Sequence, residues 1–298
     1  MNFKSFECSS NKKLRFEFLS SKTESERGKT LKISLRYLNI EYKNGDKPVV
    51  LIIEDNTEIN HFIAAELSPF FTIIGSTDAI KGLEIAYREI PDIIVSDIMM
   101  PGIDGIELCR KIKTDISTSH IPVILLSAKT TDENKVEGLD AGADVYLTKP
   151  FNMEVLKSQI ISLLENRRLI QQEFKKPSLN PPKINISTVD NKFLADIIAI
   201  IERNIDNSEF TVQEFTNLIG LSRTTFFKKM KSLTGQKPTE FLRNYRLKTA
   251  AQYLENGYSV KETMFKTGFN TASYFSQSFK ELFVMSPSEY IDLKKKYN

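Results

Sequence analysis

The chain has 298 residues, of which 41% are hydrophobic, and it carries 41 Lys and Arg against 38 Asp and Glu. This length suits two domains of ordinary size, and the lack of a long uncharged apolar run excludes a transmembrane segment. Two cysteines and two histidines without ligand-like spacing exclude a disulfide framework and a zinc site. The first twenty residues carry charges throughout, so they do not form a signal peptide, and we expect a cytoplasmic protein without membrane contact.

Residues 1–46 form an N-terminal extension. Apolar and charged side chains alternate at residues 14–18 and again at residues 31–37. Such alternation is typical of two half-exposed strands paired as a β-hairpin, which is only marginally stable alone. The hairpin therefore either packs on the domain that follows or ends a larger domain. We assign it no function.

Residues 47–168 alternate short apolar runs with helical patterns. This alternation predicts an α/β domain with a five-stranded, doubly wound parallel sheet of the flavodoxin-like type. Polar residues stand at the ends of the strands that lead into the expected ligand-binding edge. They are Glu54, Asp55, Asp97, Ser127 and Lys149. Because ligands bind at the carboxyl ends of parallel strands, we expect these side chains to meet in one cleft.

The three carboxylates of this set predict metal-assisted phosphoryl chemistry. Carboxylates this close repel one another, so they stay ionised together most readily around a hard divalent cation, which beside a phosphate is usually Mg²⁺. The cation and Lys149 would offset the phosphoryl charge, and Asp97 would serve as the nucleophile. Singly, a Ser after a strand is more often a helix cap and a Lys-Pro pair a loop. Their joint order favours an aspartyl-phosphate switch.

On these motifs, residues 47–168 resemble the receiver domain of two-component response regulators. The resemblance implies that a histidine kinase phosphorylates Asp97. It also implies a Mg²⁺ site at Asp97, in which Asp55 and the Met99 backbone carbonyl ligate the ion directly and Glu54 acts through water.

The resemblance assigns three further residues in the same cleft. Ser127 would hydrogen-bond the phosphoryl group, Lys149 would form an ion pair with it, and Tyr146 would act as an aromatic rotamer switch. We expect no independent enzyme, because the sequence offers no second catalytic constellation beside the receiver's own phosphotransfer and autodephosphorylation.

A linker is expected at residues 169–189, since residues 175–182 read KKPSLNPP, with three prolines and no helical period. Residues 152–168 have the apolar spacing of the fifth helix of the α/β domain. Beyond the linker, strand patterns disappear, and residues 190–298 predict a helical domain. The balance of charge changes as well, from 12 basic against 19 acidic residues in the α/β domain to 16 against 12 in the helical domain.

An internal repeat organises the helical domain. TVQEFTNLIGLSRTTFF at 211–227 is echoed by SVKETMFKTGFNTASYF at 259–275. Each copy predicts a helix, a turn with Gly220 or Gly268, and a second helix, which is the signature of a helix-turn-helix unit. Eight basic residues against one Glu between positions 223 and 248 favour an anionic partner.

The two copies, joined by a long helix at 239–256, resemble the two subdomains of the AraC/XylS-type DNA-binding domain, which implies double-stranded DNA as a partner. Helical spacing places Phe226, Met230 and Leu233 in the core of the first copy. The same spacing places Phe275, Phe279 and Leu282 in the core of the second copy. The residues expected to face DNA are Arg223, Thr224, Phe227, Lys228, Lys231, Asn270, Ser273, Gln277 and Lys280.

Two positions of the second copy depart from the family pattern. Gln277 stands where an Arg is usual, and Val284 stands where the pattern has Gly. Because one phosphate-binding cation is lost, we expect the first copy to contribute more of the DNA affinity.

The primary hypothesis is a DNA-binding transcription regulator of a two-component phosphorelay, switched by phosphorylation of Asp97. Phosphorylation would pair two chains as a homodimer through the surface near the fourth helix, fifth strand and fifth helix of the α/β domain. One alternative is a phosphate sink or relay receiver with weak or no specific DNA binding. Another is the C-terminal fragment of a hybrid sensor histidine kinase. For the helical domain alone, a protein-interaction module is the alternative.

Overall fold

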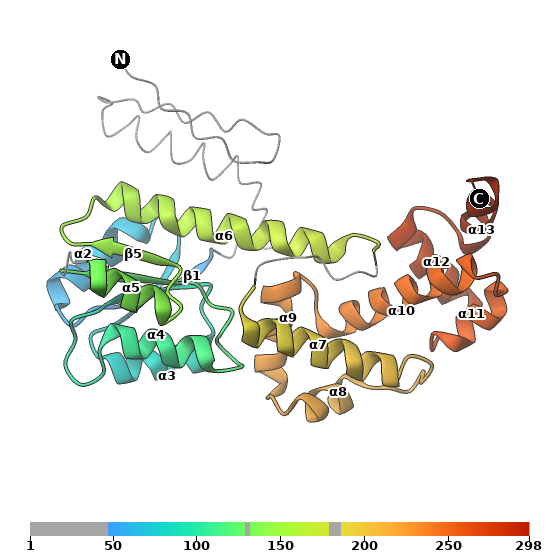
Figure 1. The fold of residues 1–298 in the computed structure, drawn as a ribbon, viewed down its shortest axis with the longest axis horizontal. Coiled ribbons are helices and arrows are strands. Elements are labelled where there is room, and N and C mark those ends of the chain that lie inside the picture. Colours follow the sequence, from blue (N-terminus) through green and yellow to red (C-terminus); the bar gives the residue numbers. More distant parts are fainter. Residues whose placement is uncertain (1–46, 129–131, 179–185, 298) are drawn as a thin grey trace, which may run out of the picture. The chain divides into compact units, whose positions relative to one another are not determined.

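A computed structural model describes residues 47–128, 132–178 and 186–297. The β-hairpin expected within residues 1–46 lies outside the described residues. The α/β domain alternates strands and helices (Figure 1). In chain order its elements are β1 (Val49–Ile53), α2 (Thr57–Leu67), β2 (Thr72–Ser76), α3 (Ala79–Glu89), β3 (Ile93–Asp97), α4 (Gly105–Thr114), β4 (Val123–Ser127), α5 (Asp132–Asp140), β5 (Val145–Thr148) and α6 (Met153–Lys175). Within the described ranges, no helix is both long and apolar enough to cross a bilayer.

The strands form one parallel sheet in the order β2-β1-β3-β4-β5. This is the flavodoxin-like order expected from the sequence. The winding reverses between β1 and β3, and that reversal opens a crevice at the carboxyl ends of these two strands. Glu54 and Asp97 lie at this edge, where β1 and β3 end.

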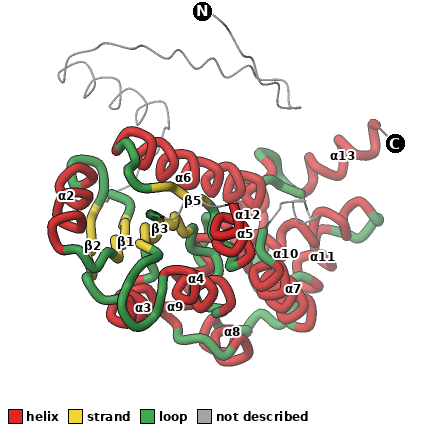
Figure 2. Tube along the Cα trace, turned by 60° about the vertical axis from the view of Figure 1, so that its left-hand side comes forward, coloured by secondary structure: helices red, strands yellow, loops and turns green. Residues whose placement is uncertain are grey.

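Both faces of the sheet are covered, because successive residues of a strand point to opposite faces. In β1, Val50 and Ile52 pack toward α2 and α6, whereas Leu51 and Ile53 pack toward α3 and α4. Figure 2 shows these two helix pairs on opposite sides of the strands. Continuous apolar strands are the expected consequence of burial on both faces.

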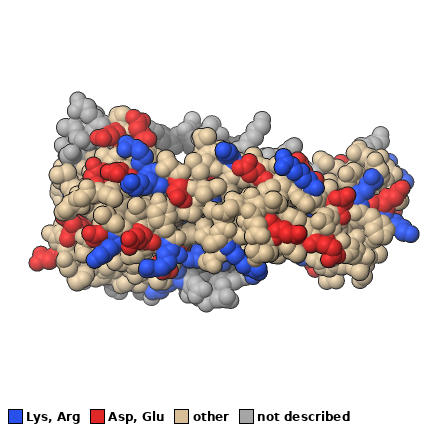
Figure 3. All heavy atoms as spheres, turned by 90° about the horizontal axis from the view of Figure 1, so that it is seen from below, with Lys and Arg blue, Asp and Glu red and all other residues tan. Residues whose placement is uncertain are grey.

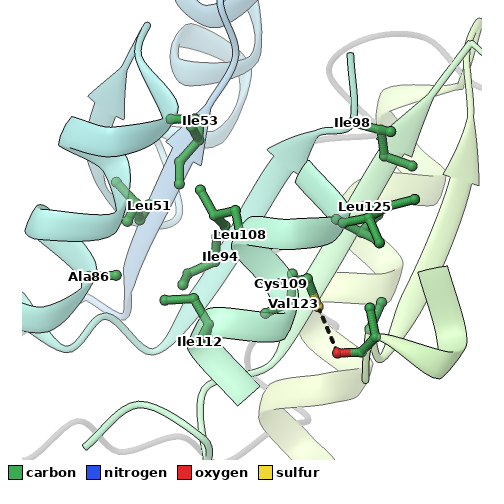
Figure 4. Packing of buried hydrophobic residues seen from close by; sticks show 14 of the residues in the cluster. Leu51, Ile53, Ala86, Ile94, Ile98, Leu108, Cys109, Ile112, Val123 and Leu125 are labelled. Carbon is green, nitrogen blue, oxygen red and sulfur yellow. Dashed lines mark hydrogen bonds between the residues drawn. The ribbon is translucent and has the colours of Figure 1, made fainter. Parts of the chain in front are cut away.

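The cluster on the α3–α4 face has Cys109 near its centre (Figure 4). The thiol of Cys109 donates to the backbone carbonyl of Ala141 at 3.6 Å. Burial raises the pKa of Cys109 to about 12. The thiol therefore stays protonated and contributes packing rather than reactivity.

Helix α6 belongs to two hydrophobic cores. Leu156, Ile160 and Leu164 pack on the sheet, while Ile170 and Phe174 pack in the core of the helical domain. Figure 1 shows α6 running on beside α9 (Arg223–Thr234). The helix ends at Lys175, so the start of the segment predicted to be a linker is helical and packed.

The helical domain contains only helices in its described part. They are α7 (Thr188–Arg203), α8 (Val212–Ile219), α9, α10 (Pro238–Glu255), α11 (Val260–Lys266), α12 (Ala272–Phe283) and α13 (Pro287–Tyr297). The repeat recurs in the caps: Thr211 and Glu214 form a capping box at α8, and Ser259 and Glu262 form another at α11. Each box satisfies amides at the start of its helix, which defines where each helix-turn-helix unit begins.

Each helix-turn-helix unit has its own core, as the repeat predicts. Phe226, Met230 and Leu233 of α9 are buried in one cluster, and Phe275 and Phe279 of α12 are buried in the other. Helix α10 contributes to both clusters and thereby joins the two units.

Val284 ends α12 in the left-handed conformation, with φ at 65°, where its counterpart Gly235 ends α9 with φ at 68°. A β-branched residue is strained in this region.

We expect Val284→Gly to raise the free energy of unfolding by about 1 kcal/mol, since the strain is removed while an 84% exposed side chain loses little packing. Urea denaturation measures this. Gly220→Val is the matched control, because Gly220 ends α8 at φ 74° with open space around an added Cβ. That control should destabilise the protein; a lower urea midpoint for Val284→Gly would contradict the expectation.

Candidate functional site

Three carboxylates meet at the carboxyl edge of the sheet. Glu54 and Asp55 follow β1, and Asp97 ends β3. Each offers a ligand atom within 4.8 Å of the others. Glu54 is 1% exposed and Asp97 is 5% exposed, whereas Asp55 is exposed to solvent. The sequence prediction that these residues converge is confirmed by this geometry.

Lys149 reaches into the same cleft from the end of β5. Its Nζ donates to Glu54 Oε2 at 2.7 Å and lies 3.1 Å from Asp97 Oδ2. Its backbone amide donates to the carbonyl of Ser127 at 2.6 Å, which ties the end of β5 to the end of β4. Lys149 is thus positioned to stabilise a negatively charged group bound beside Asp97.

Burial and charge act against each other in this cleft. Burial has the largest effect on Glu54 and raises its pKa, while the hydrogen bond from Lys149 acts in the opposite direction. Burial lowers the pKa of Lys149, but the hydrogen bond to Glu54 and the charge of Asp97 outweigh it, so this pKa lies above its ordinary value. Lys149 is therefore a fixed cation near neutral pH.

The backbone around Asp97 depends on a glycine that we did not predict. Asp97 Oδ1 accepts a hydrogen bond from the amide of Ile98 at 2.9 Å. Gly105 begins α4, and a Cβ placed there would lie 2.1 Å from the Asp97 carbonyl oxygen. Only glycine allows this close approach of α4 to the strand end. In the sequence, the signal was the second glycine of PGIDG.

The remaining residues predicted for this cleft lie on β4 and β5 and just after β3. Ser127 ends β4 and is fully buried. Tyr146 lies on β5 and is half-buried, with its ring close to Gly138 of α5. The side chain of Met99 is 53% exposed. The roles of these residues toward a phosphoryl group and a metal stay predictions.

The donor set fits a hard divalent cation. Three carboxylates within ligand reach supply the oxygen atoms that Mg²⁺ prefers. Glu54 and Asp97 are nearly inaccessible to water, so water screens their mutual repulsion weakly, and Lys149, which pairs with both, balances only part of the charge of the three carboxylates. Glu54, Asp55 and Asp97 are therefore the residues that would hold Mg²⁺.

The residues predicted to face DNA divide into two groups. Those of the second copy, Asn270, Ser273, Gln277 and Lys280, are all exposed. Those of the first copy are mixed. Arg223, Thr224 and Lys231 are exposed, but Phe227 and Lys228 are only partly accessible. The guanidinium of Arg223 lies 5.3 Å from the Phe227 ring centroid, and Phe227 also packs partly against the core of the first unit, so less of its ring is accessible than the outward position predicts. Its contact with DNA stays a prediction.

The basic cluster of the first copy is not one solvated face. Lys229 is fully buried, and Arg246 donates to the carbonyls of Asn204 and Asn207. Lys248 donates to the Phe174 carbonyl at the end of α6, and burial lowers its pKa to about 8. Figure 3 shows basic and acidic side chains interspersed over the face it draws. The number of basic residues between positions 223 and 248 therefore overstates the positive charge exposed at the surface.

A buried polar network that the sequence did not predict joins the two domains. Lys229 Nζ of α9 donates to Asp190 Oδ1 of α7 at 2.5 Å and to Ser119 Oγ of the α/β domain at 3.0 Å. Ser119 Oγ also donates to Asp190 Oδ1 at 2.7 Å. The three residues are 0–3% exposed.

Comparison with known proteins identifies both domains. The model of the response regulator receiver domain matches residues 50–161, and that of a helix-turn-helix domain matches residues 215–292. Histidine kinase P4 of Formosa agariphila is 39% identical over 82% of this chain and 18% of its own length.

Two further relatives match less than half of the chain each. Hybrid signal transduction histidine kinase D of Dictyostelium discoideum is 31% identical over 49% of this chain and 9% of its own length. DNA-binding dual master transcriptional regulator RpaA of Synechocystis is 36% identical over 43% of this chain and 54% of its own length. The chain thus spans a small part of the two kinases and about half of the regulator. Together, these matches place residues 50–161 in the response regulator receiver family and residues 215–292 among helix-turn-helix domains.

Proposed function

We propose that the protein is a DNA-binding transcription regulator of a two-component phosphorelay, switched by phosphorylation of Asp97. The observation that carries the proposal is the arrangement of Glu54, Asp55, Asp97 and Lys149 at one sheet edge of a chain that also holds two helix-turn-helix units. A receiver domain joined to such units supports a regulator rather than a metabolic enzyme.

The cleft supports transfer of a phosphoryl group to Asp97. A histidine kinase is the proposed donor: its phosphohistidine N–P bond breaks, and a bond from an Asp97 carboxylate oxygen to phosphorus forms. Lys149, 3.1 Å from Asp97 Oδ2, stabilises the charge on the transferred group. Bound Mg²⁺ would neutralise further phosphoryl charge, held by Asp55, Asp97 and the Met99 carbonyl, with Glu54 acting through water. Ser127 and Tyr146 are the proposed sensors of the phosphoryl group.

The helix-turn-helix units support binding to double-stranded DNA, with α9 and α12 entering the major groove. The exposed face of α12 offers amide, hydroxyl and ammonium groups, which suit base edges and phosphates. On phosphorylation, two chains would pair and align their units on repeated half-sites.

Lys280 provides the test of this DNA interface. Lys280→Ala is expected to weaken binding to a duplex selected from a random-sequence pool and to reduce the salt dependence by about one phosphate equivalent. The measurement is a titration at several salt concentrations. Lys192→Ala removes an exposed charge from α7 and should leave both quantities unchanged. Equal effects of the two changes would remove Lys280 from the interface.

Two alternatives remain as proposals of their own. The similarity to two histidine kinases, of which this chain spans 18% and 9%, supports the alternative that the chain is the C-terminal fragment of a hybrid sensor histidine kinase. A phosphate sink or relay would accept phosphate at Asp97 but select no duplex, so the same selection distinguishes it from the regulator.

A further inference from the structure

The recognition helix of the first copy, α9, lies against the α/β domain at the edge opposite Asp97. Lys228 Nζ donates to the backbone carbonyl of Glu89 at 2.6 Å and lies 3.5 Å from that of Arg88. These carbonyls end α3, and the last carbonyls of a helix carry partial negative charge. Lys228, which we expect to bind a DNA phosphate, is thus already held by anionic groups within the chain.

The adjacent residue strengthens the same contact. Lys229, one residue further along α9, reaches Ser119 in the loop that precedes β4, and Asp190 completes this buried network. A buried ion pair is costly to leave half-made, because the remaining charge loses its partner away from water. The network therefore defines one specific position of α9 on the α/β domain.

Helix α6 forms hydrogen bonds with both α9 and the α/β domain. Gln171 donates to the carbonyl of Ser232 at 2.7 Å, near the end of α9. One turn earlier, Arg167 donates to the carbonyls of Asp92 at 3.1 Å and His120 at 2.8 Å. These two carbonyls lie in the loops before β3 and β4, so α6 ties α9 and the amino-terminal edge of the sheet to a single element.

We infer that this edge of the α/β domain is an intramolecular docking surface for α9, and that docking withholds the first helix-turn-helix unit from DNA. The inference rests on the proposed function. A phosphate that binds Lys228 must displace the Glu89 and Arg88 carbonyls, and a duplex along α9 meets the end of α3. DNA binding and docking therefore exclude each other at Lys228.

The second copy provides an internal contrast. Gln277 holds the position that corresponds to Lys228, and its amide bonds Glu281 of its own helix at 3.3 Å. Asn270, Ser273 and Lys280 are exposed. The α/β domain thus masks one unit and leaves the other accessible. In the docked form, DNA meets only the unit that lacks a cation at this position.

A substitution on the α/β side of the contact tests the inference without touching the DNA-binding residues. Ser119→Leu removes the hydroxyl shared by Lys229 and Asp190 and adds volume at a site that is 2% exposed. If the docked form dominates, its release is expected to tighten binding of unphosphorylated protein to a selected duplex by about tenfold. Ser68→Leu makes the same chemical change at an exposed position and should bind as wild type does. Equal affinity of folded Ser119→Leu and wild type would overturn the inference.

Amide hydrogen exchange on the wild-type chain gives a second readout that needs no variant. Addition of the selected duplex is expected to speed exchange in residues 88–92 and 115–120, because their cover is withdrawn. Unchanged or slower exchange there, while the duplex protects residues 223–234 of α9, would overturn the inference and leave the proposed function standing. Failure of wild type and Ser119→Leu alike to select any duplex would overturn both.

Discussion

Asp97→Asn is expected to reduce phosphoryl incorporation from acetyl phosphate and Mg²⁺ to background. An amide cannot supply the anionic oxygen that attacks phosphorus, and Asp97 is the carboxylate that ends β3 beside Lys149. Intact-mass measurement records incorporation directly. Chelation of Mg²⁺ should abolish incorporation in the wild type as well, because the clustered carboxylates would then repel the phosphoryl group.

Asp104→Asn is the matched control for this change. Asp104 caps α4, accepts from the amide of Glu107, and is not among the clustered carboxylates Glu54, Asp55 and Asp97. It should be phosphorylated as wild type is. Incorporation that persists in Asp97→Asn would move the acceptor to another carboxylate, with Asp55 the first to examine.

Lys229→Met is expected to destabilise the protein by about 3–5 kcal/mol, because it leaves the Asp190 carboxylate buried without its cation. Burial already lowers the pKa of Lys229, and the charge of Asp190 opposes that effect. The hydroxyls of Ser119 and Ser187 still donate hydrogen bonds to this carboxylate but supply no charge. Urea denaturation measures the loss.

The double variant Lys229→Met with Asp190→Leu is expected to recover much of the stability, since both charged groups are then replaced by apolar ones. Lys231→Met is the control on the same helix, and at an exposed position it should change stability by less than about 0.5 kcal/mol. A double variant no more stable than Lys229→Met would show that packing, not an unpaired charge, causes the loss.

The α/β domain and its acidic cleft were predictable from the sequence for a local reason. The strands are continuous apolar runs, and in a parallel sheet the residue after each run must lie at one edge. Glu54, Asp97 and Lys149 could therefore be brought together without any knowledge of packing. The helix-turn-helix units were equally predictable from the sequence, because their core positions follow helical spacing.

The burial of Lys229 follows from helical spacing only in hindsight. It lies three residues after Phe226 and four before Leu233, so it shares their inward face. Its partners could not be found that way. Asp190 is 39 residues distant and Ser119 is 110 residues distant, and only the tertiary fold brings them together.

The linker prediction failed at its start for a similar reason. The prolines marked where regular structure ends, but the boundary at residue 169 assumed that the fifth helix serves one domain. Ile170 and Phe174 continue the helical spacing of α6 and pack in the other domain. Sequence periodicity indicates a helix without indicating which core it joins.

The double membership of α6 limits how such proteins can be recombined. A helix turns by about 100° for each residue. One residue inserted between Leu164 and Ile170 would keep Leu164 on the sheet while turning Phe174 away from the helical domain. Exchange of α/β domains between related regulators is therefore expected to succeed only where the number of residues along this helix is preserved. The junction must keep the rotational phase of the helix as well as its apolar residues.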